Sequence, residues 1–166
     1  MIERGLAGVL AVCAVLSASA QPIRLYVDAD APPGLNGLSW SSALSSLEEL
    51  RNEISALTNN SATIEVWIAE GTYTVPMTEM DEAGLVIGTR PDESITFIGG
   101  FAGGETSADQ ADPDANPVNI VPVTADGVHH PELVSLQGGS FEVRGINFSG
   151  LNLFPGPPLA GNSATL

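Results

Sequence analysis

Residues 94–117 read SITFIGGFAGGETSADQADPDANP and carry the strongest indication of the fold. In the first part, Ile95 and Phe97 alternate with polar residues, as in a β-strand with one buried face. The glycines that follow allow the backbone to turn sharply or to approach another segment closely. We therefore predict a short strand that ends at a tight corner and leads into an acidic loop projecting from the body of the protein.

The glycine-rich part of this stretch, GGFAGGET at 99–106, differs by one residue from the phosphate-binding pattern G-x-x-x-x-G-K-[ST]. That loop needs a lysine that reaches the phosphates and a helix N-terminus behind it. Glu105 stands in the place of the lysine, and Pro113 and Pro117 disfavour a helix downstream. These features exclude a nucleotide as the partner.

Similar short runs with alternating apolar residues recur on both sides of this stretch. They include IEVWIA at 64–69, VNIVPV at 118–123, ELVSLQG at 132–138 and SFEVRGINFSG at 140–150. Gly71 and Gly145 mark further corners between runs. Short strands separated by polar turns are typical of a β-sandwich or of a parallel solenoid.

One segment has a helical period, and it precedes the repeated runs. Its apolar residues, spaced three or four apart, are Leu44, Leu47, Leu50, Ile54 and Leu57. Ser41 or Ser42 is the expected N-cap, and Asn59–Asn60 the expected end. The first coil of a solenoid exposes an open core and an unpaired edge, which such a helix can cover. This segment therefore favours the solenoid.

Four segments in order resemble a known group of proteins: LYVDADAPPGLNGLSWSSALSSLEEL (25–50), IEVWIAEGTY (64–73), ITFIGGFAGGETSADQADPDANP (95–117) and FEVRGINFSG (141–150). They look like the N-terminal portion of secreted bacterial right-handed parallel β-helix proteins. These have the pectate-lyase-like fold and include a polymorphic outer-membrane or autotransporter-like group. The resemblance implies an all-β solenoid of about three coils with an N-terminal capping α-helix, incomplete at its C-terminus. Ile98 and Ala111 depart from the pattern of the group, which usually has an aromatic residue and an arginine there.

The first twenty residues, MIERGLAGVLAVCAVLSASA, have the features of a secretory signal peptide. Arg4 precedes an apolar stretch, and residues 18–20 form an A-x-A cleavage site. A lipoprotein signal ending at Cys13 is the alternative. We expect a signal peptide at 1–20, a strand and capping helix at 21–60, β-helix coils at 61–154 and a Pro/Gly-rich tail at 155–166. The expected location is outside the bacterial cell or on its surface, with no membrane span after removal of the signal.

The charge of the chain is strongly negative. There are 20 acidic residues against 5 basic ones, giving a net charge of −15. Nucleic acids and anionic lipids are bound by clustered cations, so both are excluded as partners. Divalent cations and cationic partners are compatible with this charge.

The acidic stretch offers candidate ligands for one such ion. Asp112, Asp114 and Asn116 mimic the D-x-D-x-N opening of a calcium loop, but Pro117 and Val123 break the remainder of that pattern. A looser calcium site that also uses Asp109 is one interpretation. The other, which we favour, is a loop in which Asp and Asn side chains bond their own backbone. Ca²⁺ is thus a candidate ion, and no cofactor is required.

Other residues have a catalytic or binding interpretation beside a structural one. Trp67 alternates with inward residues, so it faces outward, where it either packs with Trp40 or stacks on a sugar ring. Arg144 also faces outward, and His129–His130 precede a proline in a loop. No set of residues for nucleophilic catalysis is recognisable.

These observations predict an exported structural or surface-interaction module without intrinsic catalysis. An extracellular polysaccharide or a surface protein is the expected partner, with a role in adhesion or carbohydrate contact. The alternative, which rests on the resemblance, is the N-terminal part of a polysaccharide lyase or glycoside hydrolase whose catalytic coils lie beyond residue 166.

Overall fold

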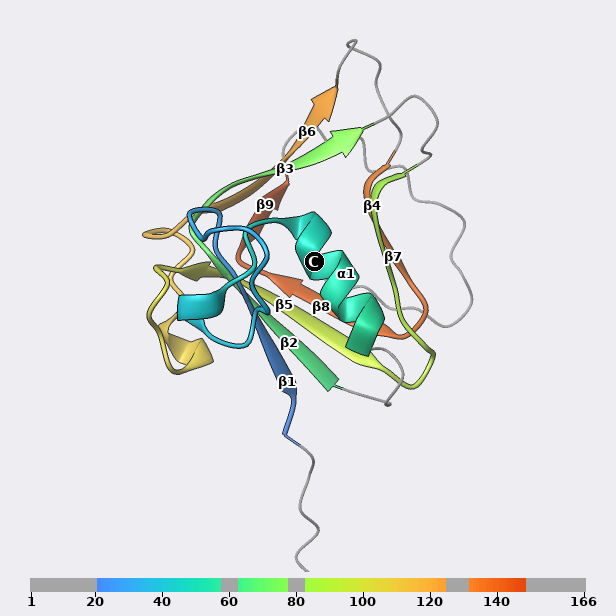
Figure 1. Ribbon diagram of the computed structural model, residues 1–166, viewed down its shortest axis with the longest axis horizontal. Helices are drawn as coiled ribbons and strands as arrows, with labels where there is room; N and C mark the ends of the chain where they lie inside the picture. The colour runs from blue at the N-terminus through green and yellow to red at the C-terminus, as the bar shows by residue number, and fades with distance from the viewer. Residues whose placement is uncertain (1–20, 58–62, 78–82, 125–131, 149–166) are drawn as a thin grey trace, which may run out of the picture.

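The computed structural model describes residues 21–57, 63–77, 83–124 and 132–148 of the chain (Figure 1). The strands in these ranges are β1 (Ile23–Val27), β2 (Thr63–Ala69), β3 (Gly71–Met77), β4 (Ala83–Gly88), β5 (Ser94–Phe101), β6 (Val118–Thr124), β7 (Glu132–Gln137), β8 (Ser140–Arg144) and β9 (Ile146–Phe148). The α-helix α1 (Leu47–Leu57) and the 3-10 helix η1 (Trp40–Ser42) lie between β1 and β2, and the 3-10 helix η2 (Ala108–Gln110) lies between β5 and β6.

The strands form three parallel sheets. Sheet 1 has the order β1-β2-β5-β8, sheet 2 the order β3-β6-β9, and sheet 3 contains β4 and β7. From β2 onward the chain enters the three sheets in turn, and each later pass adds a strand beside the strand of the previous pass. In Figure 1 the sheets form the sides of a triangle around a common interior. Because the sheets of a β-sandwich are antiparallel, this pairing excludes the sandwich interpretation for the described residues.

The interior is filled by the alternating apolar residues of the strands. Ile64, Val66 and Ile68 of β2 are fully buried, as their alternation predicted, and Ile95 and Phe97 of β5 lie beside Ile64 and Val66 in register. Full burial of such side chains stabilises a fold by roughly 1.5–3 kcal/mol each. The predicted inward face of this sheet is therefore confirmed.

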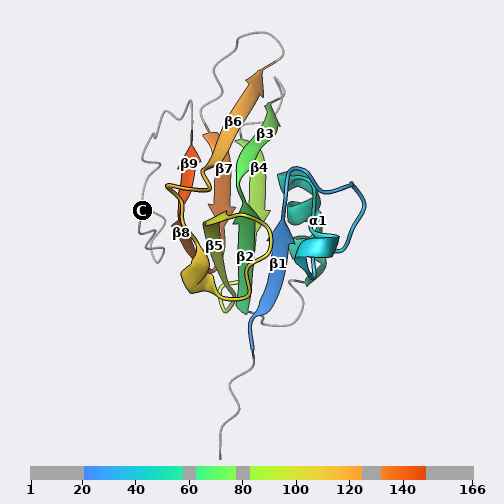
Figure 2. The same ribbon diagram turned by 90° about the vertical axis from the view of Figure 1, so that its left-hand side faces the viewer.

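Helix α1 covers one end of the interior. Its buried residues are Leu47, Leu50 and Ile54, and the helix contacts β1, β3 and β4. Figure 1 places it over the middle of the triangle, and Figure 2 places it at the β1 end of the stacked strands. The predicted apolar stripe is confirmed for these three residues and for Leu57, which is partly buried against the same core, whereas Leu44 lies before the helix.

The predicted start of the helix was wrong. Ser41 and Ser42 lie in η1, and α1 begins at Leu47, where the Ser46 hydroxyl accepts a hydrogen bond from the Glu49 N–H. The reason is the segment in between: Leu44 pairs with β1 through hydrogen bonds with Tyr26 and Asp28, which holds it extended. A helix can start only after that bridge.

Strand β4 was not predicted from the sequence. Leu85 and Ile87 are buried and Val86 between them is exposed, so the strand has the expected alternation. The segment AGLVIG has only three consecutive large apolar residues with glycine on each side, which is too short a pattern to indicate a strand by itself.

The glycines of the opening stretch have a different role from the predicted corner. Gly99 and Gly100 continue β5 as far as Phe101, and Gly100 is the extra residue of a bulge opposite β2. The acidic loop does not project: the Asp112 N–H and the Asn116 side-chain amide both donate to the carbonyl of Gly100. The loop therefore folds back over β5. Gly71 and Gly145, by contrast, do lie at strand junctions and have positive φ.

Candidate functional site

The outer face of sheet 1 carries three rows of side chains, because the parallel register aligns outward residues of successive strands. The hydroxyl row is Thr63, Ser94 and Ser140. The charged row is Arg24, Glu65, Thr96 and Glu142. The aromatic row is Tyr26, Trp67, Ile98 and Arg144.

The hydroxyl and charged rows form an accessible polar strip. Thr63, Ser140 and Glu142 are exposed, and the other members are partly exposed. The Arg24 Nε donates to Glu65 Oε2 at 3.0 Å. The strip was not predicted as a site, although its signal was present: the first two outward positions of β2, β5 and β8 are all polar. Only the register shows that these positions lie side by side.

The aromatic row is largely covered. Trp67 is 0 % exposed, stacks on Phe101 with ring centroids 4.6 Å apart, and has Trp40 at 6.4 Å. Ala108 and Ala111, in and after η2, pack over the same cluster. Trp67 thus faces outward and packs with Trp40, as predicted. Stacking of a sugar on Trp67 is excluded, because its ring has no free surface.

The covering loop is fixed by the carboxylate of Glu105. This carboxylate accepts backbone hydrogen bonds from Ala102 at 2.6 Å, Gly103 at 3.1 Å and Gly104 at 2.9 Å. Partial burial raises the pKa of Glu105, but these hydrogen bonds outweigh it and hold the pKa below its ordinary value. A phosphate-binding loop offers its backbone N–H groups to an anion, and here a side chain of the same loop is that anion.

A second bond joins this loop to the segment after β1. The Trp40 Nε1 donates to the carbonyl of Glu105 at 2.9 Å. The cover of the aromatic row is therefore made of two loops that lie far apart in the sequence.

The calcium candidates Asp109, Asp112, Asp114 and Asn116 all lie in the loop that folds back. Asp112 Oδ1 accepts hydrogen bonds from the backbone of Asp114 and Ala115, which is the turn geometry that we favoured. Over the described ranges, no three His, Cys, Asp or Glu side chains lie close enough to hold one metal ion. Calcium binding by these residues stays a prediction.

The remaining polar residues near strand ends have separate surroundings or lie outside the described ranges. Asp28 accepts a hydrogen bond from the Asp30 N–H and so forms a turn after β1. Arg144 is exposed on β8, which agrees with its predicted direction. His129 and His130 lie outside the described residues, as do residues 1–20 with the predicted signal peptide. In the part of the chain that the structure describes, no helix is long and apolar enough to cross a membrane.

No protein-family model, curated protein or solved structure matches this chain. Its function is therefore inferred from the arrangement of its residues.

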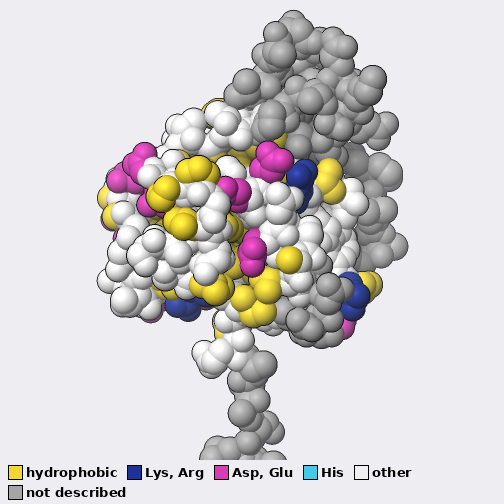
Figure 3. All heavy atoms as spheres, in the orientation of Figure 1, with side chains coloured by type: hydrophobic (Ala, Val, Ile, Leu, Met, Phe, Trp, Pro, Cys, Tyr) yellow, Lys and Arg dark blue, Asp and Glu magenta, His cyan; other side chains and the backbone are white. Residues whose placement is uncertain are grey.

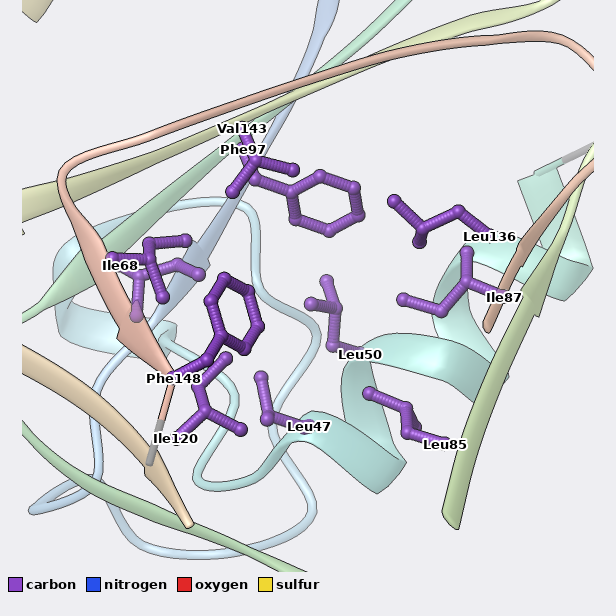
Figure 4. A pocket seen from close by; sticks show the side chains of 11 residues that line it. Leu47, Leu50, Ile68, Leu85, Ile87, Phe97, Ile120, Leu136, Val143 and Phe148 are labelled. Atoms are coloured by element: carbon purple, nitrogen blue, oxygen red, sulfur yellow. The ribbon is translucent and has the colours of Figure 1, made fainter. Parts of the chain in front are cut away.

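The interior of the triangle contains a cavity of about 30 Å³. Figure 4 shows the apolar side chains that point into it from the helix and from all three sheets. They are Leu47, Leu50, Ile68, Leu85, Ile87, Phe97, Ile120, Leu136, Val143, Ile146 and Phe148. A cavity with no polar lining offers a water molecule no hydrogen bonds. We interpret it as a packing gap and place the candidate site on the outer strip.

Proposed function

We propose that this chain is an exported structural module with the right-handed parallel β-helix fold, and that its outer polar strip contacts an extracellular partner. The successive entry of the chain into three parallel sheets, with a helix over the first pass, supports the fold. Solenoids of this kind present long, regular outer surfaces that are used for binding. The resemblance of the four sequence segments to exported β-helix proteins supports the location.

The observation that carries the proposal is the alignment of the hydroxyl and charged rows across neighbouring strands. Adjacent strands are about 4.8 Å apart, which is roughly the length of one sugar unit in a linear polysaccharide. A polysaccharide lying across the strands would meet a similar polar side chain at each unit. Hydroxyl and carboxylate groups are suitable hydrogen-bond partners for sugar hydroxyls.

The negative charge of the protein favours neutral polysaccharides over acidic ones. With a net charge of −15, the chain repels acidic polymers at ordinary salt concentrations. We therefore propose a neutral polysaccharide, for which the carboxylates of Glu65 and Glu142 serve as acceptors and Arg24 as donor. Such contact is suited to adhesion.

Co-sedimentation with insoluble polysaccharides tests this function. The test protein comprises residues 21–166, which contain every described residue, and neutral polymers such as cellulose and chitin are compared with polygalacturonate. We expect retention on a neutral polymer. The change Thr96→Arg should abolish retention, because a long side chain in the middle of the strip blocks a chain lying across it.

Thr74→Arg is the matched control, since Thr74 is an exposed threonine on β3 in a different sheet. It should leave retention unchanged. No retention on any neutral polymer, or equal loss in both variants, would contradict the proposed site. Release of reducing ends from the polymer would contradict a purely structural role and favour the lyase or hydrolase alternative.

A further inference from the structure

All three sheets end at the same end of the molecule, opposite helix α1. β8 is the last strand of sheet 1, β9 the last of sheet 2 and β7 the last of sheet 3. Figure 2 shows β8 and β9 on the side away from α1. We call this the β7–β9 end. No described element pairs with these three strands on their outer side.

The apolar residues at this end are incompletely buried. In sheet 1, Val66 is 0 % and Phe97 is 6 % exposed, whereas Val143, next in the same register, is only partly buried. In sheet 2, Ile120 is 4 % exposed and its neighbour Phe148 is only partly buried. Among the described residues, the last strand of each of these sheets thus lacks the covering layer that the earlier strands have.

We propose that a second copy of this chain covers the β7–β9 end, with the two β8 strands antiparallel about a two-fold axis at Val143. Strand edges with unpaired N–H and C=O groups are templates for pairing with another chain. Two identical edges can pair in this way because a two-fold interface places the same surface on both partners.

The side chains of β8 select the register of this pairing. Residues that lie opposite one another must point to the same face of the sheet, inward with inward and outward with outward. This holds only when the two-fold axis is level with one residue of the strand. An axis at Glu142 would place this carboxylate opposite itself, which is destabilising. An axis at Val143 places Glu142 of one copy opposite Arg144 of the other, twice, and brings the two Val143 side chains together in the core. Glu142 and Arg144 are both exposed in the single chain and free to make these pairs sterically.

The same axis exchanges the other two sheets. It places β9 of one copy next to β7 of the other, so that Phe148 and Leu136 gain apolar neighbours. Both side chains already border the interior cavity and are only partly buried. The interface would thereby join two apolar interiors end to end.

Sedimentation velocity of residues 21–166 over a concentration series tests the inference. The unchanged chain should form a dimer. Glu142→Arg and Arg144→Glu should each weaken the dimer by about tenfold or more, because each places like charges opposite one another twice. The double change Glu142→Arg with Arg144→Glu should restore dimerisation, since it recreates opposite charges across the axis.

Glu48→Arg is the control for net charge, because its side chain is 66 % exposed on α1 at the other end of the molecule. It should leave the dimer unchanged. A chain that stays monomeric at about 100 μM would overturn the inference, since a stable interface of this kind associates well below that concentration. A dimer that both single changes leave intact, or one that the double change does not restore, would place the contact elsewhere. Circular dichroism of each variant separates loss of pairing from loss of fold.

Discussion

The two ends of the stacked sheets differ in how the edge strands and the apolar interior are covered. At the β1 end, the chain covers its own edge: Tyr26 N–H bonds to the carbonyl of Gly37, and Leu44 N–H bonds to the carbonyl of Tyr26. Helix α1 then closes the interior with Leu50 and Ile54. At the β7–β9 end, the described residues provide neither a paired edge nor a covering helix. The last strand of a parallel sheet leaves unpaired backbone groups at its edge, so each end of the stack needs a segment or a partner that covers it.

The contrast also concerns charge. At the β1 end, the Glu49 carboxylate accepts backbone hydrogen bonds from Gly34 at 2.9 Å and Ser45 at 2.8 Å, and so ties α1 to the preceding loop. At the other end, Glu142 and Arg144 are exposed on an edge strand. The Glu49 carboxylate thus accepts hydrogen bonds within the chain, whereas the side chains of Glu142 and Arg144 are accessible to a partner.

The largest expected effect is on the free energy of unfolding, when a fully buried leucine and a partly buried one are each replaced by alanine. Leu50→Ala at the α1 end should lower the free energy of unfolding by about 3–5 kcal/mol, because Leu50 is 0 % exposed and its loss enlarges the cavity. Leu136→Ala at the β7–β9 end should lower it by only about 1 kcal/mol, because Leu136 is partly exposed already. Urea denaturation of the monomer measures both, and equal losses would remove the proposed difference between the ends.

A second prediction concerns the join between the inner strands and the β7–β9 end. A side chain at Gly99 would clash with the carbonyl of Gly145, and one at Gly145 would lie 2.6 Å from the carbonyl of Gly99. Gly99→Ala should therefore force the third pass away from the second and cost about 2–3 kcal/mol. Gly104→Ala, which meets no atom within 4 Å, is the matched control and should be near neutral. A neutral Gly99→Ala would show that the two passes are not held so closely.

The smallest effect is a pH dependence at the α1 end. Hydrogen bonds from the backbone of Gly34 and Ser45 lower the pKa of Glu49 below its ordinary value. A lowered folded pKa means that the stabilisation is present above the ordinary value of 4.5 and is lost as the pH falls through the folded value. Glu49→Gln should thus cost about 0.5–1 kcal/mol at neutral pH and much less at about pH 3.

Glu142→Gln is the comparison variant at the β7–β9 end. Its side chain is exposed and accepts no backbone hydrogen bond from the described part of the chain, so the change should alter the stability of the monomer little at either pH. Thermal unfolding at the two pH values gives the result. If Glu49→Gln cost the same at both, its carboxylate would not be the group that ties the helix.

The sequence predicted the features that follow from the regular spacing of apolar residues. The alternation of Ile64, Val66 and Ile68 identified the inward face of β2, and the spacing of Leu47, Leu50 and Ile54 identified the covering face of α1. It also predicted that Trp67 points outward. Strand β4 was missed because its run of three large apolar residues is too short to show an alternation.

What the sequence did not predict depends on contacts between distant segments. The burial of Trp67 requires the loops around Trp40 and Ala108 to meet over it, and no local pattern indicates that meeting. The same holds for the start of α1, which is set by the bridge between Leu44 and β1. The polar strip likewise appears only when the register places Thr96 between Glu65 and Glu142.

Native-state hydrogen exchange at low protein concentration tests the difference between the ends most directly. We predict that the amides of β2, which is paired with β1 on one side and β5 on the other, exchange only through global unfolding. The amides of β8 and β9 should exchange faster through local opening, because within the described ranges each of these strands is paired on one side only. Equal protection of β2 and β8 would contradict the account, since it would mean that the β7–β9 end is as well closed as the end beneath the helix.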